Sequence, residues 1–156
     1  MVASAATARI VRAGDEGQLS LDVARRAGIY PEDYRYAPCE VDRELAEGDR
    51  YQVGDLVLET LAVPGHAADQ IAFVLRQDRT VSVFCGDALF EGGRILLQDI
   101  RDCSVQESCR SIEKLHKLRM DGLYPGHRGF SVRRGLQHAE AAMQRIRRLL
   151  PPEQLI

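Results

Sequence analysis

The chain has 156 residues, a length that suits one domain with a single hydrophobic core. Lysine plus arginine number 21 and aspartate plus glutamate number 23, so the near-neutral balance gives no sign of a nucleic-acid-binding surface. No apolar stretch approaches the roughly 20 residues that a bilayer crossing needs, and no signal peptide opens the chain. Because the four cysteines form no C-x-x-C pair, we expect reduced thiols in a soluble, cytoplasmic protein without nucleic-acid or membrane partners.

The first part of the chain is predicted to be mainly helical. Ser4 is expected to cap a helix over residues 5–12 that stops at Gly14. A second helix is predicted over residues 19–27, where apolar side chains recur on one face and Gly28 follows as a stop.

From Cys39 to Cys85 the apolar period changes to two, which is typical of strands with one buried face. Turn-forming residues separate the apolar runs, as in Gly54-Asp55 and Asp78-Arg79. The pattern predicts an antiparallel meander with strands over residues 41–45, 51–53, 56–63, 70–76 and 80–85.

Helical periodicity returns after the meander. It predicts helices over residues 104–118 and about 132–150, with a short strand over 122–124 between them and Pro151 at the end. The predicted fold class is therefore mixed α/β (α+β), an antiparallel meander sheet with flanking helices.

Three potential metal ligands each follow a predicted strand on a turn. His66 and His127 both stand directly after Pro-Gly, and Asp87 follows Gly86 at the end of an apolar run. Glycine gives the chain a sharp exit from the strand and leaves room beside a metal. Because the three turns leave strands at what could be one sheet edge, we expect His66, Asp87 and His127 to form a metal site.

Histidine and aspartate suit zinc, iron and manganese alike. A bound divalent ion lowers the pKa of its water to about 7 and so provides hydroxide near neutral pH. The expected cofactor is zinc, with iron or manganese as alternatives, and the expected partner is a small-molecule substrate.

Other polar residues receive less specific predictions. His116 and His138 are expected to be ordinary, partly exposed histidines, and Cys85 a buried structural thiol. Asp69 either accepts a hydrogen bond from a ligand imidazole or caps the next strand. The segment 88–94 is either a plain surface turn or a flexible loop that lines a substrate pocket.

Together these motifs resemble the metallo-beta-lactamase fold superfamily of metal-dependent hydrolases. The resemblance is carried by Val-Pro-Gly-His at 63–66, Phe-Cys-Gly-Asp-Ala-Leu-Phe at 84–90, Gly-Gly-Arg at 92–94 and Leu-Tyr-Pro-Gly-His at 123–127. It implies an αβ/βα sandwich in which His66 binds one metal, Asp87 bridges two metals and His127 binds the second.

The chain departs from the family pattern in one respect. The family carries an H-x-H-x-D-H motif upstream of these ligands, and this chain has none. We therefore expect residues 1–156 to form a single but partial, N-terminally truncated domain with weak metal binding and little hydrolysis. Apolar sheet surface left uncovered by the missing half is expected to seek a partner.

Three functional hypotheses follow from the resemblance. The first is a metal-dependent hydrolase of an ester, thioester, lactone or phosphodiester, impaired in this short chain. The second is a non-catalytic module or truncated remnant that covers its exposed sheet by homodimerising. The third is an iron-dependent oxygenase similar to persulfide dioxygenases, in which His66 and Asp87 supply two of three iron ligands.

Overall fold

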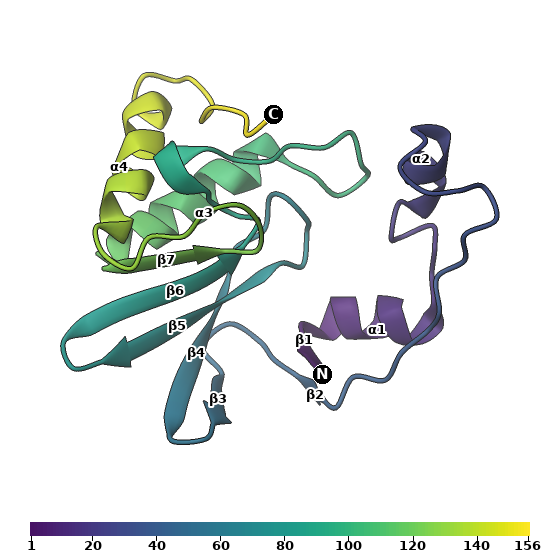
Figure 1. Cartoon of the computed structure of the whole chain (residues 1–156), viewed down its shortest axis with the longest axis horizontal. Helices are drawn as coiled ribbons and strands as arrows, with labels where there is room; N and C mark the ends of the chain where they lie inside the picture. Colours follow the sequence, from purple (N-terminus) through teal and green to yellow (C-terminus); the bar gives the residue numbers. More distant parts are fainter. The chain divides into compact units, whose positions relative to one another are not determined.

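The structure is a computed structural model that describes all residues 1–156. The chain forms two compact units, one of residues 1–45 with 99–101 and one of residues 46–98 with 102–156 (Figure 1). No helix in either unit has both the length and the apolar character needed to span a bilayer. The assignment of residues 1–156 to one domain stays a prediction.

The first unit begins with the predicted capped helix. In α1 (Ala5–Ala13) the Ser4 side chain accepts a hydrogen bond from the Thr7 backbone N–H at 3.2 Å. Gly14 ends the helix in the left-handed conformation, with a φ of 63°. The buried face of α1 packs on Val41 in a small apolar cluster.

The alternating segment 41–45 is not a strand of the meander, which corrects the prediction. Instead β2 (Arg43–Glu44) pairs in parallel with β1 (Val2–Ala3) as a separate two-stranded sheet. The alternation has another cause, because Val41 is buried against α1 rather than against a neighbouring meander strand.

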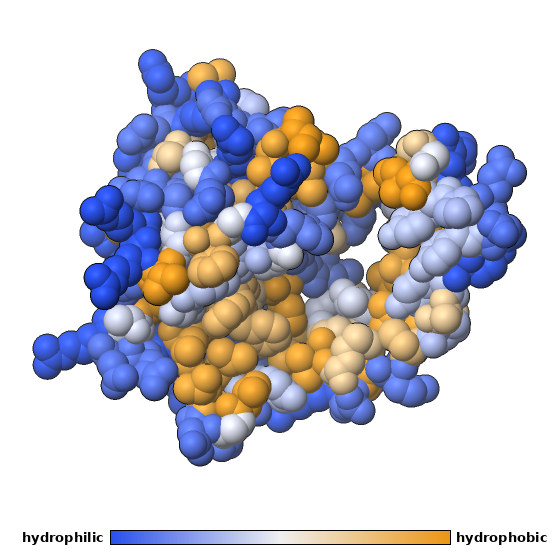
Figure 2. Space-filling model, in the orientation of Figure 1, coloured by the Kyte–Doolittle hydropathy of each residue, from blue (hydrophilic) through white to orange (hydrophobic).

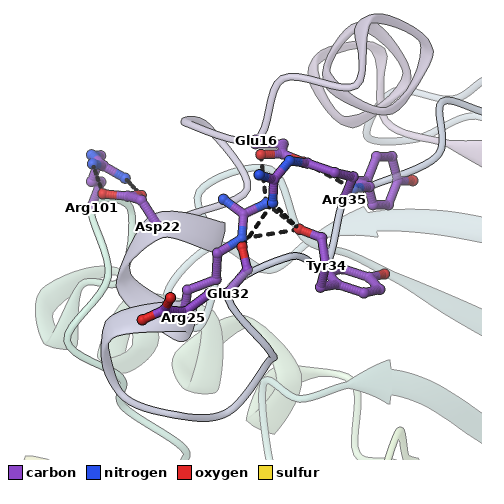
Figure 3. Close-up of polar contacts among 8 residues, drawn as sticks. Glu16, Asp22, Arg25, Glu32, Tyr34, Arg35 and Arg101 are labelled. Carbon is purple, nitrogen blue, oxygen red and sulfur yellow. Dashed lines mark hydrogen bonds and ion pairs between the residues drawn. The ribbon is translucent and has the colours of Figure 1, made fainter.

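Helix α2 (Leu21–Arg26) starts two residues later than predicted, because Ser20 takes a left-handed φ of 54° just before it. Hydrogen bonds and ion pairs connect α2 to the segments that contain Glu16, Tyr34 and Arg101 (Figure 3). Arg25 donates to the Glu16 carboxylate at 2.6 Å and to the Tyr34 carbonyl. Arg101 donates two hydrogen bonds of 2.8 Å to Asp22, and these bonds hold the pKa of the Asp22 carboxyl well below its usual range.

The second unit contains the predicted meander as a five-stranded sheet. Its strands lie in the order β3-β4-β5-β6-β7 (Figure 1). Their bounds are Arg50–Val53, Leu56–Ala62, Ile71–Gln77, Thr80–Gly86 and Gly122–Pro125. Pairing is antiparallel from β3 to β6, whereas β7 runs parallel to β6 because α3 (Val105–Lys117) lies between these two strands in the sequence.

Helices α3 and α4 (Gly135–Ile146) cover one face of this sheet. Helix α3 begins as predicted, with the Ser104 hydroxyl accepting a hydrogen bond from the Glu107 N–H. Side chains from β5, β6, β7 and both helices form one buried core, which includes Val74, Val83, Ile112, Leu123 and Ala139. The mixed α/β class with an antiparallel sheet and flanking helices is confirmed.

The last helix is shorter than its apolar pattern predicts. Arg134 has a φ of 63° and delays the start of α4 to Gly135, while Leu149 has a φ of 59° beyond its end. Leu149 is 95% exposed, so this leucine extended the predicted periodicity without belonging to the buried face.

The opposite face of the sheet is apolar and partly exposed. The strand register aligns Phe73 with Phe84 and Phe84 with Tyr124 across β5, β6 and β7. The Tyr124 ring stacks on Phe84 at 4.8 Å and on Phe130 at 5.8 Å between ring centroids. Figure 2 shows hydrophobic residues gathered over β4, β5 and β6 on this side. We call this surface the outer sheet face.

Candidate metal centre

The three predicted ligands come together at one edge of the sheet. Strands β4, β6 and β7 all run in the same direction, because β5 is antiparallel to both β4 and β6 while β7 is parallel to β6. Their carboxyl ends therefore meet at one edge. His66 follows β4, Asp87 follows β6 and His127 follows β7.

Both imidazoles face the same carboxylate oxygen. Asp87 Oδ2 lies 3.6 Å from His66 Nε2 and 3.4 Å from His127 Nε2. Both distances exceed a normal hydrogen bond. They match the separation of about 3.4 Å between two ligands that each lie about 2.0–2.1 Å from a tetrahedral zinc ion.

A backbone contact fixes the tautomer of His66. Its Nδ1 lies 2.9 Å from the Leu96 carbonyl oxygen, which only accepts hydrogen bonds. Neutral His66 therefore carries its proton on Nδ1 and directs the lone pair of Nε2 toward Asp87. This is how ligating histidines are usually oriented by their surroundings.

The Asp87 carboxylate is largely but not fully buried, and one of its oxygens lacks a hydrogen-bond donor. Its side chain is 15% exposed, and its second oxygen, Oδ1, is buried with no hydrogen-bond partner. The Gln70 side-chain oxygen is likewise buried and unpaired, although its amide nitrogen donates to the Cys85 carbonyl at 2.9 Å. Since a buried unpaired carboxylate oxygen is costly, the arrangement suits a cation at Asp87.

Glycines before the ligands are required by close contacts. A Cβ atom on Gly65 would lie 2.6 Å from the backbone of Ser108, and one on Gly126 would lie 2.8 Å from Asp87 Oδ1. The Gly126 N–H also donates to the Gly86 carbonyl at 2.8 Å, which joins the turns of Asp87 and His127 directly. The Pro-Gly and Gly positions thus bring the turns closer than other residues would allow.

The donors fit a metal in pairs rather than as one triad. No group of three or more histidine, cysteine, aspartate and glutamate side chains is arranged to hold an ion. Asp87 instead forms one pair with His66 and another with His127. His127 is the most exposed of the three side chains, at 71%. The assignment of these residues as metal ligands stays a prediction.

Two neighbouring predictions have different outcomes. Cys85 is fully buried, as expected, and burial raises the pKa of its thiol to about 12. The Asp69 carboxylate makes neither of its predicted contacts. In its place the Asp102 carboxylate accepts a hydrogen bond from the Ala68 N–H at 3.1 Å, just after His66.

His138 was predicted to be partly exposed, and this prediction is wrong. It is 7% exposed, and its Nδ1 accepts a hydrogen bond of 2.9 Å from the Gly92 N–H. Burial lowers the pKa of this imidazole, against an opposing effect of Glu91. The sequence does contain a sign of this burial. His138 and the buried Ala142 are four residues apart and therefore lie on one face of α4.

Most apolar side chains in the segment after Asp87 belong to the buried core, whereas Glu91, Gly92 and Arg94 are exposed. Leu89, Phe90 and Ile95 are almost fully buried, and a short 3-10 turn, η1 (Glu91–Gly93), packs on α4. The segment therefore connects the turn of Asp87 to helix α4 through buried contacts.

Comparison with known proteins reveals partial similarity to hydrolases. No protein-family model matches the chain. The hydroxyacylglutathione hydrolase of Bradyrhizobium sp. (strain ORS 278) is 38% identical over 65 residues, which are 42% of this chain and 25% of that protein. The hydroxyacylglutathione hydrolase of Hahella chejuensis is 45% identical over 49 residues, 31% of this chain and 19% of that protein. The matched part spans about a quarter or less of these relatives.

Solved structures with the same fold cover more of the chain. The metallo-beta-lactamase family protein TTHA1429 from Thermus thermophilus has a TM-score of 0.60 at 25% identity, covering 89% of this chain and 49% of that one. ETHE1 from Myxococcus xanthus has a TM-score of 0.51 at 25% identity, covering 70% and 53%. The BLEG-1 B3 metallo-beta-lactamase has a TM-score of 0.65 at 17% identity, covering 83% and 58%, a likeness of fold alone.

Proposed function

We propose that the chain, which shares the metallo-beta-lactamase fold of its structural neighbours and is similar in part to hydroxyacylglutathione hydrolases, is a member of the metallo-beta-lactamase fold superfamily and provides His66, Asp87 and His127 to a metal-dependent hydrolase site. The observation that carries the proposal is the approach of two imidazole Nε2 atoms to one carboxylate oxygen, at 3.6 and 3.4 Å. The unpaired, buried Oδ1 of the same Asp87 carboxylate supports it further.

Each residue has a distinct part in the proposed site. The carboxylate of Asp87 lies between the imidazoles and would be the donor shared by both ligand pairs, to which His66 and His127 would each contribute one imidazole. The Leu96 carbonyl keeps the His66 ring in the ligating tautomer. When bound, a divalent ion supplies Lewis acidity and lowers the pKa of its water to about 7.

A thioester is the proposed substrate class among the esters, thioesters, lactones and phosphodiesters considered. The support is the similarity to hydroxyacylglutathione hydrolases, whose name specifies an acyl group carried by the glutathione thiol. All four cysteines of the chain are free thiols. This supports the proposed cytoplasmic location, because thiols stay reduced in that compartment.

Residues 1–156 hold only part of the ligand set that this chemistry needs. Catalytic zinc usually has three protein ligands and one open position, whereas each pair around Asp87 supplies two. We therefore propose that the chain alone binds metal weakly and has little hydrolytic activity. Donors from another polypeptide segment would complete both positions.

Metal content measured by elemental mass spectrometry tests the proposal. The protein is purified without chelators and compared with a variant carrying His66→Ala and Asp87→Ala, and with His116→Ala as a control histidine outside the site. Because weak binding is proposed, each purified protein is equilibrated by dialysis against excess zinc, and its bound zinc is measured relative to the dialysis buffer. We expect bound zinc in the wild type and in His116→Ala, and its loss in the double variant. Equal metal in all three proteins, or none in any, would refute the site.

The same measurement separates zinc from the iron alternative. Two histidines and one carboxylate also suit Fe(II), as in the oxygenase hypothesis, and ETHE1 from Myxococcus xanthus shares the fold at 25% identity. Iron in place of zinc, accompanied by oxygen uptake with a persulfide, would favour that alternative over hydrolysis.

The outer sheet face supports a second proposal, in which the chain acts as a non-catalytic module that homodimerises. Phe84 is 40% exposed there and Phe130 61%, and the aligned residues Phe73, Phe84 and Tyr124 carry no charge. Two copies that cover this face would remove apolar surface from water.

Sedimentation velocity tests dimer formation. We expect the wild type to sediment as a dimer and Phe84→Glu to sediment as a monomer. Leu149→Glu alters an exposed leucine outside this face and is the matched control, which should stay dimeric. A wild type that is monomeric at about 100 μM would exclude this module.

A further inference from the structure

The turns that carry Asp87 and His127 are connected a second time, away from the proposed ligands. Glu91 stands four residues after Asp87, and Ser131 stands four residues after His127. The Ser131 hydroxyl lies 3.1 Å from Glu91 Oε1 and 2.7 Å from Nε2 of the buried His138. A short polar chain thus links both turns to helix α4.

The direction of each hydrogen bond in this chain can be assigned. The Gly92 N–H donates to Nδ1 of His138, so Nδ1 carries no proton. Neutral His138 therefore holds its proton on Nε2 and donates it to the Ser131 oxygen. The Ser131 hydroxyl is then free to donate to the Glu91 carboxylate, and every member has a partner. We call Glu91, Ser131 and His138 with the Gly92 N–H the Ser131 tether.

Steric contacts hold the same segments together. A Cβ atom on Gly129 would lie 2.3 Å from Glu91 Oε2, so the loop after His127 rests directly on that carboxylate. Ser131 also exchanges two backbone hydrogen bonds with Leu123 of β7, at 2.8 and 2.9 Å. The end of the loop from His127 to Ser131 is therefore hydrogen-bonded to β7. The same loop contacts the segment after Asp87 at the Glu91 side chain.

We infer that Glu91, Ser131 and His138 are positioning residues that couple the turn of Asp87 to the turn of His127. Their importance is greatest for His127, because this side chain is 71% exposed and has little packing of its own. The coupling itself is independent of any metal. Only its consequence for ligand geometry rests on the proposed function.

Hydrogen exchange measured by mass spectrometry tests the coupling in the full chain. Ser131→Ala removes the central hydroxyl, Ser131→Thr retains it, and Ser82→Ala removes a half-buried hydroxyl on β6 that makes no hydrogen bond. We expect exchange in segments 87–93 and 127–131 to become about tenfold faster in Ser131→Ala, as for the loss of about one hydrogen bond. Ser131→Thr and Ser82→Ala should match the wild type.

Unchanged exchange in both segments of Ser131→Ala would overturn the inference. A uniform increase that includes β5 and β6 would overturn it too, because that result indicates general destabilisation. His138→Asn retains an acceptor for Gly92 but does not reach Ser131, so it should release the 127–131 segment more than the 87–93 segment. Equal release of both segments would contradict the assigned hydrogen bonds.

A zinc titration followed by the imidazole signals of His66 and His127 in nitrogen-15 NMR separates this inference from the proposed function. We expect Ser131→Ala to weaken the zinc response of His127 by about tenfold, in the range seen for residues that support metal ligands, and Ser131→Thr to restore it. If the wild type gives no zinc response, the proposed metal site fails, while the exchange result still decides the coupling. A zinc response equal in wild type and Ser131→Ala would refute the effect on His127.

Discussion

Replacing Gly93 by alanine should destabilise the protein through backbone strain and through a close contact with α4. Gly93 has a φ of 78°, and a Cβ atom there would lie 2.5 Å from the Ala142 nitrogen and 2.7 Å from the His138 carbonyl oxygen. The left-handed conformation costs an alanine about 1–2 kcal/mol. Forcing the 3-10 turn η1 away from α4 adds about 1–3 kcal/mol, the usual penalty of overpacking. The expected loss is therefore about 2–5 kcal/mol.

The neighbouring glycine provides a matched control. Gly92 has a φ of 77°, but the nearest atom to its Cβ position is 3.9 Å away, in the Arg94 side chain. Gly92→Ala should therefore lose only the conformational part, about 1–2 kcal/mol. The two variants differ only in the contact with α4.

Urea denaturation at 25 °C, followed by circular dichroism, measures the difference. With a slope of about 2 kcal/mol per M, the extra 1–3 kcal/mol lowers the midpoint of Gly93→Ala by about 0.5–1.5 M relative to Gly92→Ala. Equal midpoints for the two variants would refute the close packing of η1 on α4, and with it the view that α4 supports the turn of Asp87.

Three further predictions concern the site and its surroundings. Gly126→Ala should weaken zinc binding by about 10–100-fold in a chelator competition assay, because the new Cβ would press on Asp87 Oδ1; unchanged affinity would contradict this. Burial lowers the pKa of His138 below 6.5, so only the unfolded chain gains a proton as pH falls below about 6.5, and stability should decline there. Urea midpoints between pH 7.5 and 5.5 should decline less in His138→Gln; parallel slopes would disprove the contribution. Burial raises the pKa of Cys85 to about 12, so iodoacetamide at pH 8 should modify exposed Cys39 and spare Cys85, as mass spectrometry would show.

Much of the fold was predictable because its elements follow local patterns. The capped helix at Ser4, the meander strands and the start of α3 at Ser104 all depend on residues a few positions apart. The segment 41–45 was assigned wrongly because alternation identifies a strand but not its partner. Pairing of β2 with β1 joins residues about 40 positions apart, and no local pattern specifies this.

The proximity of the three candidate ligands was predictable from the sequence, whereas the contacts that support their turns were not. Pro-Gly-His and Gly-Asp turns identify His66, Asp87 and His127, and the structure brings them to one edge. The roles of Ser131 and His138 could not be inferred, because they depend on how α4 packs over the turn after Asp87. The steric need for glycine at position 93 likewise arises from contact between distant segments.

The hydrogen bond from the Gly126 N–H to the Gly86 carbonyl has a consequence for engineering. Because it joins main-chain atoms, exchanging the side chains at 87 and 127 leaves the spacing of the two turns intact. The donor atoms at these two candidate ligand positions can thus be changed separately from the backbone that holds them. If the proposed metal site forms, a cysteine at position 127, or a histidine at position 87, would alter its preference for soft or hard metals without redesign of the sheet edge.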